Sequence, residues 1–390
     1  YTNTWTVTDN CGNTSAVYTQ VITIIDTQAP TWTTAAGALN TTLQCSDAAG
    51  IAAAQAMFPI ASDNCDADVT NIVKTSGAFV AGACPDAGTY TNTWTVTDNC
   101  GNTSAVYTQV ITIIDTQAPT WTTAANALNV TLQCSDAAGI TAAQAMFPVA
   151  TDNCDANVTI IVKTAGPFVP SGCPNAGSYT NTWTVTDNCG NTSAVYTQVI
   201  TIIDTQAPTW TTAAGALNVT KQCSDAAGIA AAQAMFPVAT DNCDANVTNI
   251  VKTAGAFVPG TCPQAGTYTN TWTVTDDCGN TSAVYSQVIT IIDNVAPVIN
   301  ALPAPSTISC PAVPSFATAT ATDACDVTPT LVFNDVTVQG SCGGSYVVTR
   351  TWTATDDCGN SSTASQVITV QDLTAPVIAA LPAPSTINCP

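Results

Sequence analysis

The sequence contains no histidine and no glutamate, and only 5 of its 390 residues are lysine or arginine. Without histidine, neither a Ser-His-Asp nor a Cys-His arrangement for nucleophilic catalysis can be built, and histidine-based metal sites are excluded. Paired aspartates can transfer protons in some enzymes, but here they lie in segments typical of turns. We therefore expect no enzymatic activity.

Charge of either sign is scarce, because only 8% of the residues are charged. All 26 acidic residues are aspartate, so the net charge is 5 − 26 = −21. A strongly acidic surface repels nucleic acid and anionic membranes, so we expect neither as a partner, which leaves cations. No apolar run approaches the roughly 18 residues of a membrane span, and we expect no membrane-spanning segment.

What the sequence does contain is a repeat. The phrase YTNTWTVTD recurs every 89 residues, and a diverged copy follows the fourth after 78; the copies begin at Tyr1, Tyr90, Tyr179, Tyr268 and Tyr346. A period of 89 suits one folded β-sandwich domain per repeat. The boundary phrase Ile-Ile-Asp-x-x-Ala-Pro predicts the domains 29–117, 118–206, 207–295 and the shorter 296–374, with 1–28 and 375–390 as parts of further repeats. The near absence of linkers predicts that neighbouring repeats abut.

The repeat 29–117 reads as strands with one short helix. Thr89 to Asp98 alternates strictly, with Tyr90, Asn92, Trp94 and Val96 on one face and threonines on the other, which predicts a half-buried strand. A turn and a second strand, 104–114, follow, and 40–44 and 69–74 read as further strands. A helix is expected after Ser46 or Asp47 as N-cap and before Pro59, with Ile51 and Phe58 buried; the last full repeat lacks this segment.

The 18 cysteines recur at fixed places, which predicts a disulfide framework and an oxidising compartment. Cys84 and Cys100 flank a strand whose ends lie roughly 30 Å apart, too far for a bridge. We expect Cys65–Cys100 and Cys45–Cys84, each worth about 4 kcal/mol in the chain-entropy model; a local Cys45–Cys65 bridge is the alternative. The same positions in the other full repeats are Cys134, Cys154, Cys173, Cys189, Cys223, Cys243, Cys262, Cys278, Cys310, Cys325, Cys342 and Cys358.

Two phrases carry a resemblance to known families. Asp86-Ala87-Gly88-Thr89-Tyr90 resembles the start of strand F in immunoglobulin-like domains, although Asn92 stands where the antibody-type cysteine would be. Trp-Thr-Val-Thr-Asp-Asn-Cys-Gly-Asn-Thr-Ser, followed by Ile-Ile-Asp-x-x-Ala-Pro, resembles the hyalin-repeat (HYR-like) modules of giant surface proteins in Bacteroidetes-type bacteria, including gliding-motility adhesins of the SprB type. The resemblance implies an Ig-like sandwich, export by the type IX secretion route, and a role in adhesion or surface filaments.

Calcium is the one cofactor that the sequence suggests. If Cys65 and Cys100 are bridged, the aspartates beside them, Asp63, Asp66, Asp68 and Asp98, converge on one end of the domain. Asp26 or Asp115 could join them from a neighbouring repeat, and Ca²⁺ takes six to eight oxygen ligands. The alternative is that these aspartates only form turns, since no EF-hand spacing is present.

We therefore predict an all-β tandem array of Ig-like β-sandwich domains, each with two disulfides and most with a short helix, located outside the cell at its surface. The predicted function is a structural or adhesive shaft whose first partners are its own neighbouring repeats. The alternative is a multivalent array that binds surface glycans or a substratum. The sequence shows no cluster of exposed aromatic residues with polar partners, and we expect Trp94 and Trp32 to pack in the core and at the junction.

Overall fold

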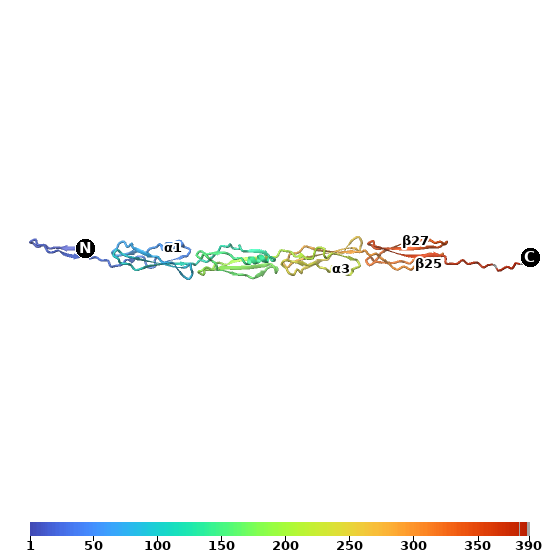
Figure 1. Cartoon of the computed structure of the whole chain (residues 1–390), viewed down its shortest axis with the longest axis horizontal. Helices are drawn as coiled ribbons and strands as arrows, with labels where there is room; N and C mark the ends of the chain where they lie inside the picture. Colours follow the sequence, from blue (N-terminus) through green and yellow to red (C-terminus); the bar gives the residue numbers. More distant parts are fainter. Residues whose placement is uncertain (382, 388–390) are drawn as a thin grey trace. The chain divides into compact units, whose positions relative to one another are not determined.

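The long alternating strand and its hairpin partner form the centre of every repeat. A computed structural model describes residues 1–381 and 383–387; Cys389 and the end of the segment 375–390 lie outside the described residues. By its internal contacts the chain divides into two units: unit 1 comprises Tyr1–Gly172 and Ala176–Ile203, and unit 2 comprises Cys173–Asn175 and Asp204–Pro390. Figure 1 shows α1 in the blue part of the chain and α3 in the yellow part.

In repeat 29–117 the strands form a two-stranded and a five-stranded sheet. The elements are β3 Thr31–Trp32, β4 Thr41–Gln44, α1 Ala48–Gln55, β5 Ala61–Ser62, β6 Ile72–Thr75, β7 Val80–Ala81, β8 Gly88–Val96 and β9 Tyr107–Ile114. Strand β8 pairs antiparallel with β9, β6 and β7, whereas β4 pairs parallel with β9. β3 pairs antiparallel with β5.

The next two repeats have the same order of elements. In repeat 118–206 they are β10 Thr120–Trp121, β11 Val130–Gln133, α2 Ala137–Gln144, β12 Ala150–Thr151, β13 Ile161–Thr164, β14 Phe168–Pro170, β15 Gly177–Val185 and β16 Tyr196–Ile203. In repeat 207–295 they are β17 Thr209–Trp210, β18 Val219–Gln222, α3 Ala226–Gln233, β19 Ala239–Thr240, β20 Ile250–Thr253, β21 Val258–Pro259, β22 Gly266–Val274 and β23 Tyr285–Ile292.

The ends of the chain depart from this order. Residues 1–28 contribute only the hairpin β1 Thr2–Trp5 and β2 Tyr18–Val21. Residues 296–374 have no helix, and three long strands replace the shorter ones; the elements are β24 Val298–Ile299, β25 Ser306–Ser309, β26 Ala321–Thr322, β27 Thr330–Gln339, β28 Tyr346–Thr355 and β29 Ser361–Gln371 (Figure 1). The predicted all-β class, with a short helix in most copies, is confirmed.

The predicted inward face of the long strand is confirmed. Asn92, Trp94 and Val96 are fully buried, and Trp94 meets Tyr107 of the partner strand edge-on with 6.0 Å between ring centroids. The buried amide Asn92 Nδ2 donates to Gln109 Oε1 at 3.0 Å. The same asparagine–glutamine hydrogen bond recurs in the next two repeats. Because buried polar groups are costly without partners, this pairing favours one register of the hairpin.

The helix begins where the sequence predicts but ends earlier. Asp47 is its N-cap, and its carboxylate accepts a hydrogen bond from the Gly50 N–H at 2.8 Å. The helix ends at Gln55, so Phe58 is not buried with Ile51 as expected. Phe58 is 53% exposed and lies edge-on to Trp94 instead, because it follows the end of α1 and does not share the helix face of Ile51.

Candidate functional site at the repeat junctions

The Asp-Asn-Cys-Gly-Asn turn after the long strand is held by its own aspartate. The Asp98 carboxylate accepts hydrogen bonds from the backbone N–H of Cys100 (2.9 Å) and Asn102 (2.8 Å) and from the Asn102 side chain. Desolvation opposes the charge, but the hydrogen bonds from Asn102, Cys100 and Gly101 outweigh it and lower the pKa of Asp98 below its ordinary value. The turn therefore presents Cys100 and Asn102 in a fixed orientation.

This turn faces the end of the preceding repeat. Asn102 Nδ2 donates to the carbonyl of Asp26 at 3.3 Å, and Asn191 Nδ2 repeats this contact with the carbonyl of Asp115 at 3.3 Å. At the second of these junctions Asn153 Nδ2, in repeat 118–206, also donates to Ser46 Oγ, in repeat 29–117, at 2.8 Å. Successive repeats within unit 1 are thus in direct contact. The local sequence pattern does not indicate this role of the asparagines, because their acceptors lie 76 residues away.

The disulfides cross this junction, which corrects the predicted pairing. Cys45 is bonded to Cys154, not to Cys84, with 5.7 Å between the Cα atoms. Cys84 is bonded to Cys189, with 5.0 Å between the Cα atoms. In the described part of the chain Cys65 carries no bridge, so neither the predicted intra-repeat pair nor the local alternative forms there.

The same pairing is found in unit 2. Its bridges are Cys223–Cys325, Cys262–Cys358 and Cys173–Cys278. Cys134 and Cys243 are also disulfide-bonded. The predicted bridges of Cys310 with Cys342 and of Cys325 with Cys358 do not form, and the described cysteines without a bridge are Cys11, Cys65, Cys100, Cys310 and Cys342. In each of the bridges Cys45–Cys154, Cys84–Cys189, Cys173–Cys278, Cys223–Cys325 and Cys262–Cys358, the second cysteine lies in the repeat after that of the first.

The physical reason is the position of the cysteines at opposite ends of a repeat. Strand β8 separates Cys84 from Cys100, as the sequence predicted, and Cys45 lies on the side of Cys84 because its N–H donates to Ile114 at the end of β9. Each end therefore carries two cysteines. Because the boundary has almost no linker, the two at one end face the two of the next repeat and bond to them.

The predicted calcium candidates divide into groups that span the junctions. One carboxylate oxygen from each of Asp26, Asp63 and Asp98 lies within 4.8 Å of the others, and the same holds for Asp115, Asp152 and Asp187. Asp66 has a different role, since its carboxylate accepts hydrogen bonds from the N–H groups of Asn99 (3.3 Å) and Asp68 (3.4 Å). We call Asp115, Asp152 and Asp187 the junction triad.

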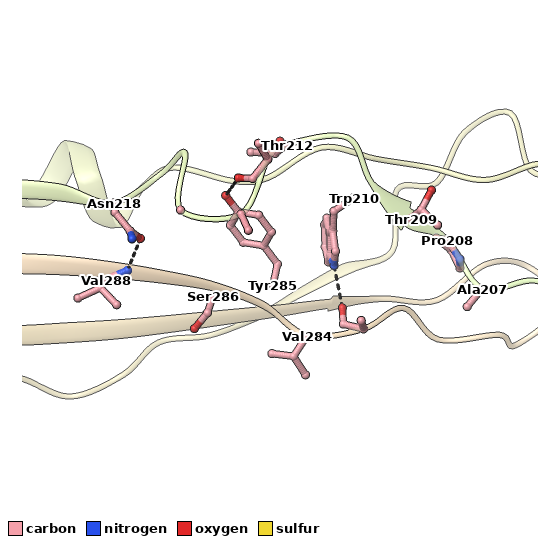
Figure 2. A pocket seen from close by; sticks show the side chains of 14 residues that line it. Ala207, Pro208, Thr209, Trp210, Thr212, Asn218, Val284, Tyr285, Ser286 and Val288 are labelled. Atoms are coloured by element: carbon pink, nitrogen blue, oxygen red, sulfur yellow. Dashed lines mark hydrogen bonds between the residues drawn. The ribbon is translucent and has the colours of Figure 1, made fainter.

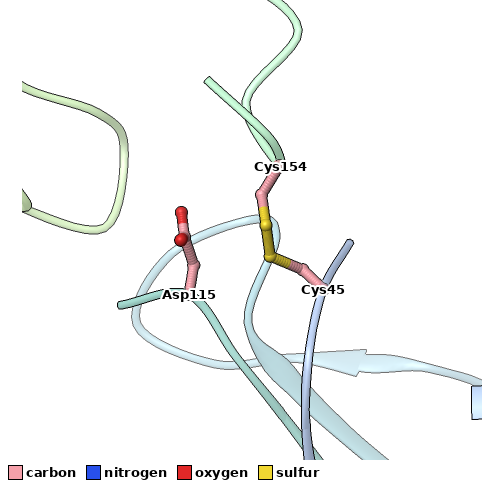
Figure 3. Close-up of side chains that lie close together, drawn as sticks. All are labelled: Cys45, Asp115 and Cys154. Atoms are coloured by element: carbon pink, nitrogen blue, oxygen red, sulfur yellow. A yellow bond between two sulfur atoms is a disulfide. The ribbon is translucent and has the colours of Figure 1, made fainter. Parts of the chain in front are cut away.

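Two members of the junction triad are buried, the third is half-buried, and none has a cationic partner among the described residues. Asp115 is only 8% exposed and Asp187 3%, and burial, reinforced by Asp152 and Asp187, raises the pKa of Asp115 above its ordinary value. The Asp115 carboxylate lies beside the Cys45–Cys154 bridge, as Figure 3 shows. The two sulfurs are bonded to each other, so they are not thiolate ligands, and the oxygens of the triad are the groups that remain for a ligand.

A second feature recurs near the start of three repeats. It is a groove of about 750 Å³ in repeat 207–295 and of about 690 and 680 Å³ in the two repeats before it. Trp210, Tyr285 and Pro208 line it (Figure 2). Trp210 Nε1 donates to Ala283 O at 2.7 Å and the Tyr285 hydroxyl to Ala213 O at 2.9 Å, so only the carbon faces of these rings meet the groove. No local sequence pattern indicates this groove, because residues from two distant segments line it.

Comparisons with known proteins give one family and a set of distant folds. The family described as "HYR-like domain with 4 cysteines" matches residues 33–113, 122–202 and 212–291. No curated protein sequence matches this chain. None of the helices in the described residues has the length and apolar character of a membrane span.

Among solved structures the chain is similar to cadherin ectodomains. Extracellular cadherin domains 1–5 of protocadherin gamma B2 share 12% identity, with 96% of this chain and 87% of that chain covered and a TM-score of 0.36. The human desmocollin-1 ectodomain shares 14% identity over 95% of this chain and 85% of that chain, with a TM-score of 0.22. Domains 22–24 of mouse cadherin-23 share 12% identity over 66% of this chain and 100% of that chain, with a TM-score of 0.28.

Proposed function

The chain belongs to the family of HYR-like domains with four cysteines, and from that premise we propose that it is a length of a tension-transmitting shaft in an extracellular surface filament or adhesin. The shaft has no enzymatic role, which the lack of histidine and glutamate supports. The observation that carries the proposal is that the bridges join successive repeats.

These bridges provide a covalent route through the array. Cys84 is bonded to Cys189, and Cys173, which precedes Cys189 by 16 residues (189 − 173), is bonded to Cys278. The segment from Cys173 to Cys189 contains strand β15, so most of this route is already extended in the fold. Tension can therefore pass from bridge to bridge through one strand of each repeat without unfolding the rest.

Simple lengths show how little such a repeat can stretch. Sixteen residues span at most about 56 Å when fully extended, and the nine residues of β15 already span about 30 Å of it. A repeat of 89 residues without bridges reaches about 310 Å. The bridges therefore remove most of the extension that unfolding would otherwise release.

Single-molecule pulling of the full chain from its two ends tests the shaft. In repeats 118–206 and 207–295 all four cysteines are disulfide-bonded. Under oxidising conditions we expect no step near 300 Å from these two repeats. After reduction and alkylation of the same chain, each is expected to give one such step. Steps of that length from the oxidised chain would refute the proposal.

The proposal also includes the cellular location of the filament, its export route and its biological role. The resemblance of the Trp-Thr-Val-Thr-Asp-Asn-Cys-Gly phrase to bacterial gliding-motility adhesins supports a cell-surface filament that serves attachment or gliding and is exported by the type IX route. The regular cysteine pairing supports an oxidising, extracellular location. Surface glycans or a substratum are the partners that such a filament would contact.

The recurrent groove supports a second candidate function, the binding of a surface glycan by each repeat. Aromatic carbon faces such as that of Trp210 can stack on a sugar ring, and three similar grooves would add avidity. The engaged Trp210 and Tyr285 donors leave the groove few polar groups to specify a sugar, so we rank this function second.

A glycan array with the full chain tests this second candidate. Specific binding that falls at least about tenfold when Trp32, Trp121 and Trp210 are all replaced by alanine would support it. Exposed Phe58, Phe147 and Phe236 replaced by alanine serve as the matched control, because these aromatic residues lie outside the groove linings. Absence of specific binding would remove the candidate.

A further inference from the structure

The junction triad presents carboxylate oxygens that accept no hydrogen bond from the described part of the chain. Asp115 Oδ1 accepts a hydrogen bond from the Gln117 N–H at 3.2 Å, but its Oδ2 is buried and has no hydrogen-bond partner. Asp152 likewise uses Oδ1 for the N–H groups of Cys154 and Asp155, and its Oδ2 is buried without a partner. Two buried carboxylate oxygens are thus left unpaired in one place.

Asp187, the third member of the junction triad, adds a further negative charge and does not neutralise the other two carboxylates. Asp187 is 3% exposed, and one of its carboxylate oxygens lies within 4.8 Å of those of Asp115 and Asp152. The three carboxyl groups come from the end of β9, the end of β12 and the turn after β15, so both repeats contribute. Buried like charges repel strongly, and removing them from water is costly unless a cation compensates them.

The chain supplies no such cation. The ammonium groups of Lys74, Lys163 and Lys252 donate to backbone carbonyls at the ends of the helices and lie over buried tryptophans. Lys221 pairs with Asp225 and Arg350 with Asp335. These are all the basic side chains of the sequence. The compensating charge must therefore come from solution.

We propose that the junction triad binds one Ca²⁺ ion, which joins the end of one repeat to the start of the next. Carboxylate oxygens are the ligands that Ca²⁺ prefers, and water completes its six to eight ligands. Oxygens within 4.8 Å of one another fit around an ion whose Ca–O distance is about 2.4 Å. This site does not depend on the function of the shaft.

Unit 2 contains an equivalent arrangement. Asp293 follows β23 as Asp115 follows β9, Asn360 Nδ2 donates to the Asp293 carbonyl as Asn191 Nδ2 does to that of Asp115, and the Asp293 Oδ2 is buried without a partner in the described residues. Asp323 and Asp356 hold the positions of Asp152 and Asp187, after β26 and after β28. A second Ca²⁺ ion is therefore assigned to Asp293, Asp323 and Asp356. Two independent copies of the site allow the binding stoichiometry to serve as a readout.

Titration of the metal-free full chain with CaCl₂, followed by calorimetry and by thermal unfolding, tests the proposal. We expect the midpoint to rise by about 5 °C in excess Ca²⁺ relative to EDTA. The double variant Asp115→Asn and Asp293→Asn is expected to bind about two fewer ions per chain. MgCl₂ is expected to give a smaller shift, because Mg²⁺ is smaller and loses its water reluctantly.

The unfolding midpoint of the double variant in EDTA distinguishes metal ligands from aspartates that only stabilise the fold. In EDTA the double variant is expected to melt no lower than the wild-type chain, because asparagine removes the buried like charge and keeps the acceptor for Gln117. Asp68→Asn is the matched control, since Asp68 is exposed and its counterparts are Asn157 and Asn246; it should leave both the shift and the stoichiometry unchanged.

Three results would overturn the proposal. They are a wild-type midpoint that does not respond to CaCl₂, a double variant that binds as many ions as the wild type, and a double variant that melts lower in EDTA. An equal response to MgCl₂ would overturn the assignment to calcium. None of these results bears on the pulling experiment, so the two proposals fail separately.

Discussion

Cleavage of the backbone between Thr116 and Gln117 is expected to leave the chain in one covalent piece. Both residues are exposed in the boundary segment between β9 and β10, so a protease site inserted there is accessible. The bridges Cys45–Cys154 and Cys84–Cys189 span the cut. Under denaturing, non-reducing electrophoresis the cleaved chain should run undivided, and reductant should release two fragments.

The sequence itself provides the matched control for this experiment. Residues 26–30 repeat the Asp-Thr-Gln-Ala-Pro segment of 115–119, but no bridge of the described residues spans them, because Cys11, Cys65 and Cys100 are unbridged. Cleavage between Thr27 and Gln28 should release the N-terminal segment without reductant. If cleavage after Thr116 also released a fragment without reductant, the pairing across the junction would be wrong.

Replacement of Trp183 by alanine is expected to destabilise its repeat strongly, because Trp183 is one of the largest fully buried side chains. Trp183 is 1% exposed and packs against Phe147 and Tyr196. Removing such a side chain typically costs about 3–5 kcal/mol, because it leaves a cavity in the core. Hydrogen exchange resolved by peptide should show protection in β16 falling by about two to three orders of magnitude.

The tryptophan of the first copy of the phrase provides a control, because it has the same local sequence as Trp183 but is not packed in a core. Trp5 occupies the equivalent position in YTNTWTVTD, but it is 50% exposed in the hairpin of residues 1–28. Trp5→Ala is expected to change stability by less than about 0.5 kcal/mol. Equal losses of protection in the two variants would show that the tryptophan acts through local strand preference and not through burial.

Within one repeat, the sequence predicted most of what the structure contains. Strict alternation from Thr89 to Asp98 identified the central strand and its buried face, because a period of two places alternate side chains on opposite sides of a sheet. The N-cap at Asp47 was also predictable from local hydrogen bonding. The pairing of β4 parallel to β9 was not, since the two strands are some 70 residues apart and no local pattern encodes their register.

The sequence predicted which residue types form the junction site but not which residues pair with one another. The sequence placed cysteines and aspartates in similar turns and suggested that Asp26 or Asp115 could join from a neighbouring repeat, and the structure brings these groups together. The prediction of Cys84 as the partner of Cys45 was wrong, because spacing and composition fit Cys84 and Cys154 equally and do not show which end of a repeat faces the next. The groove beside Trp210 was missed for a similar reason, as its walls come from separate strands.

The sequence by itself determined the period, the strand faces, the disulfide-forming residue types and the lack of catalytic histidine, because each depends on residue identity or local spacing. Only the tertiary structure decided that Cys84 meets Cys189 and that Asp115 meets Asp152 and Asp187. The reason is that these pairings depend on which end of a folded repeat each turn occupies and on which neighbour abuts that end. Both follow from the packing of complete sheets.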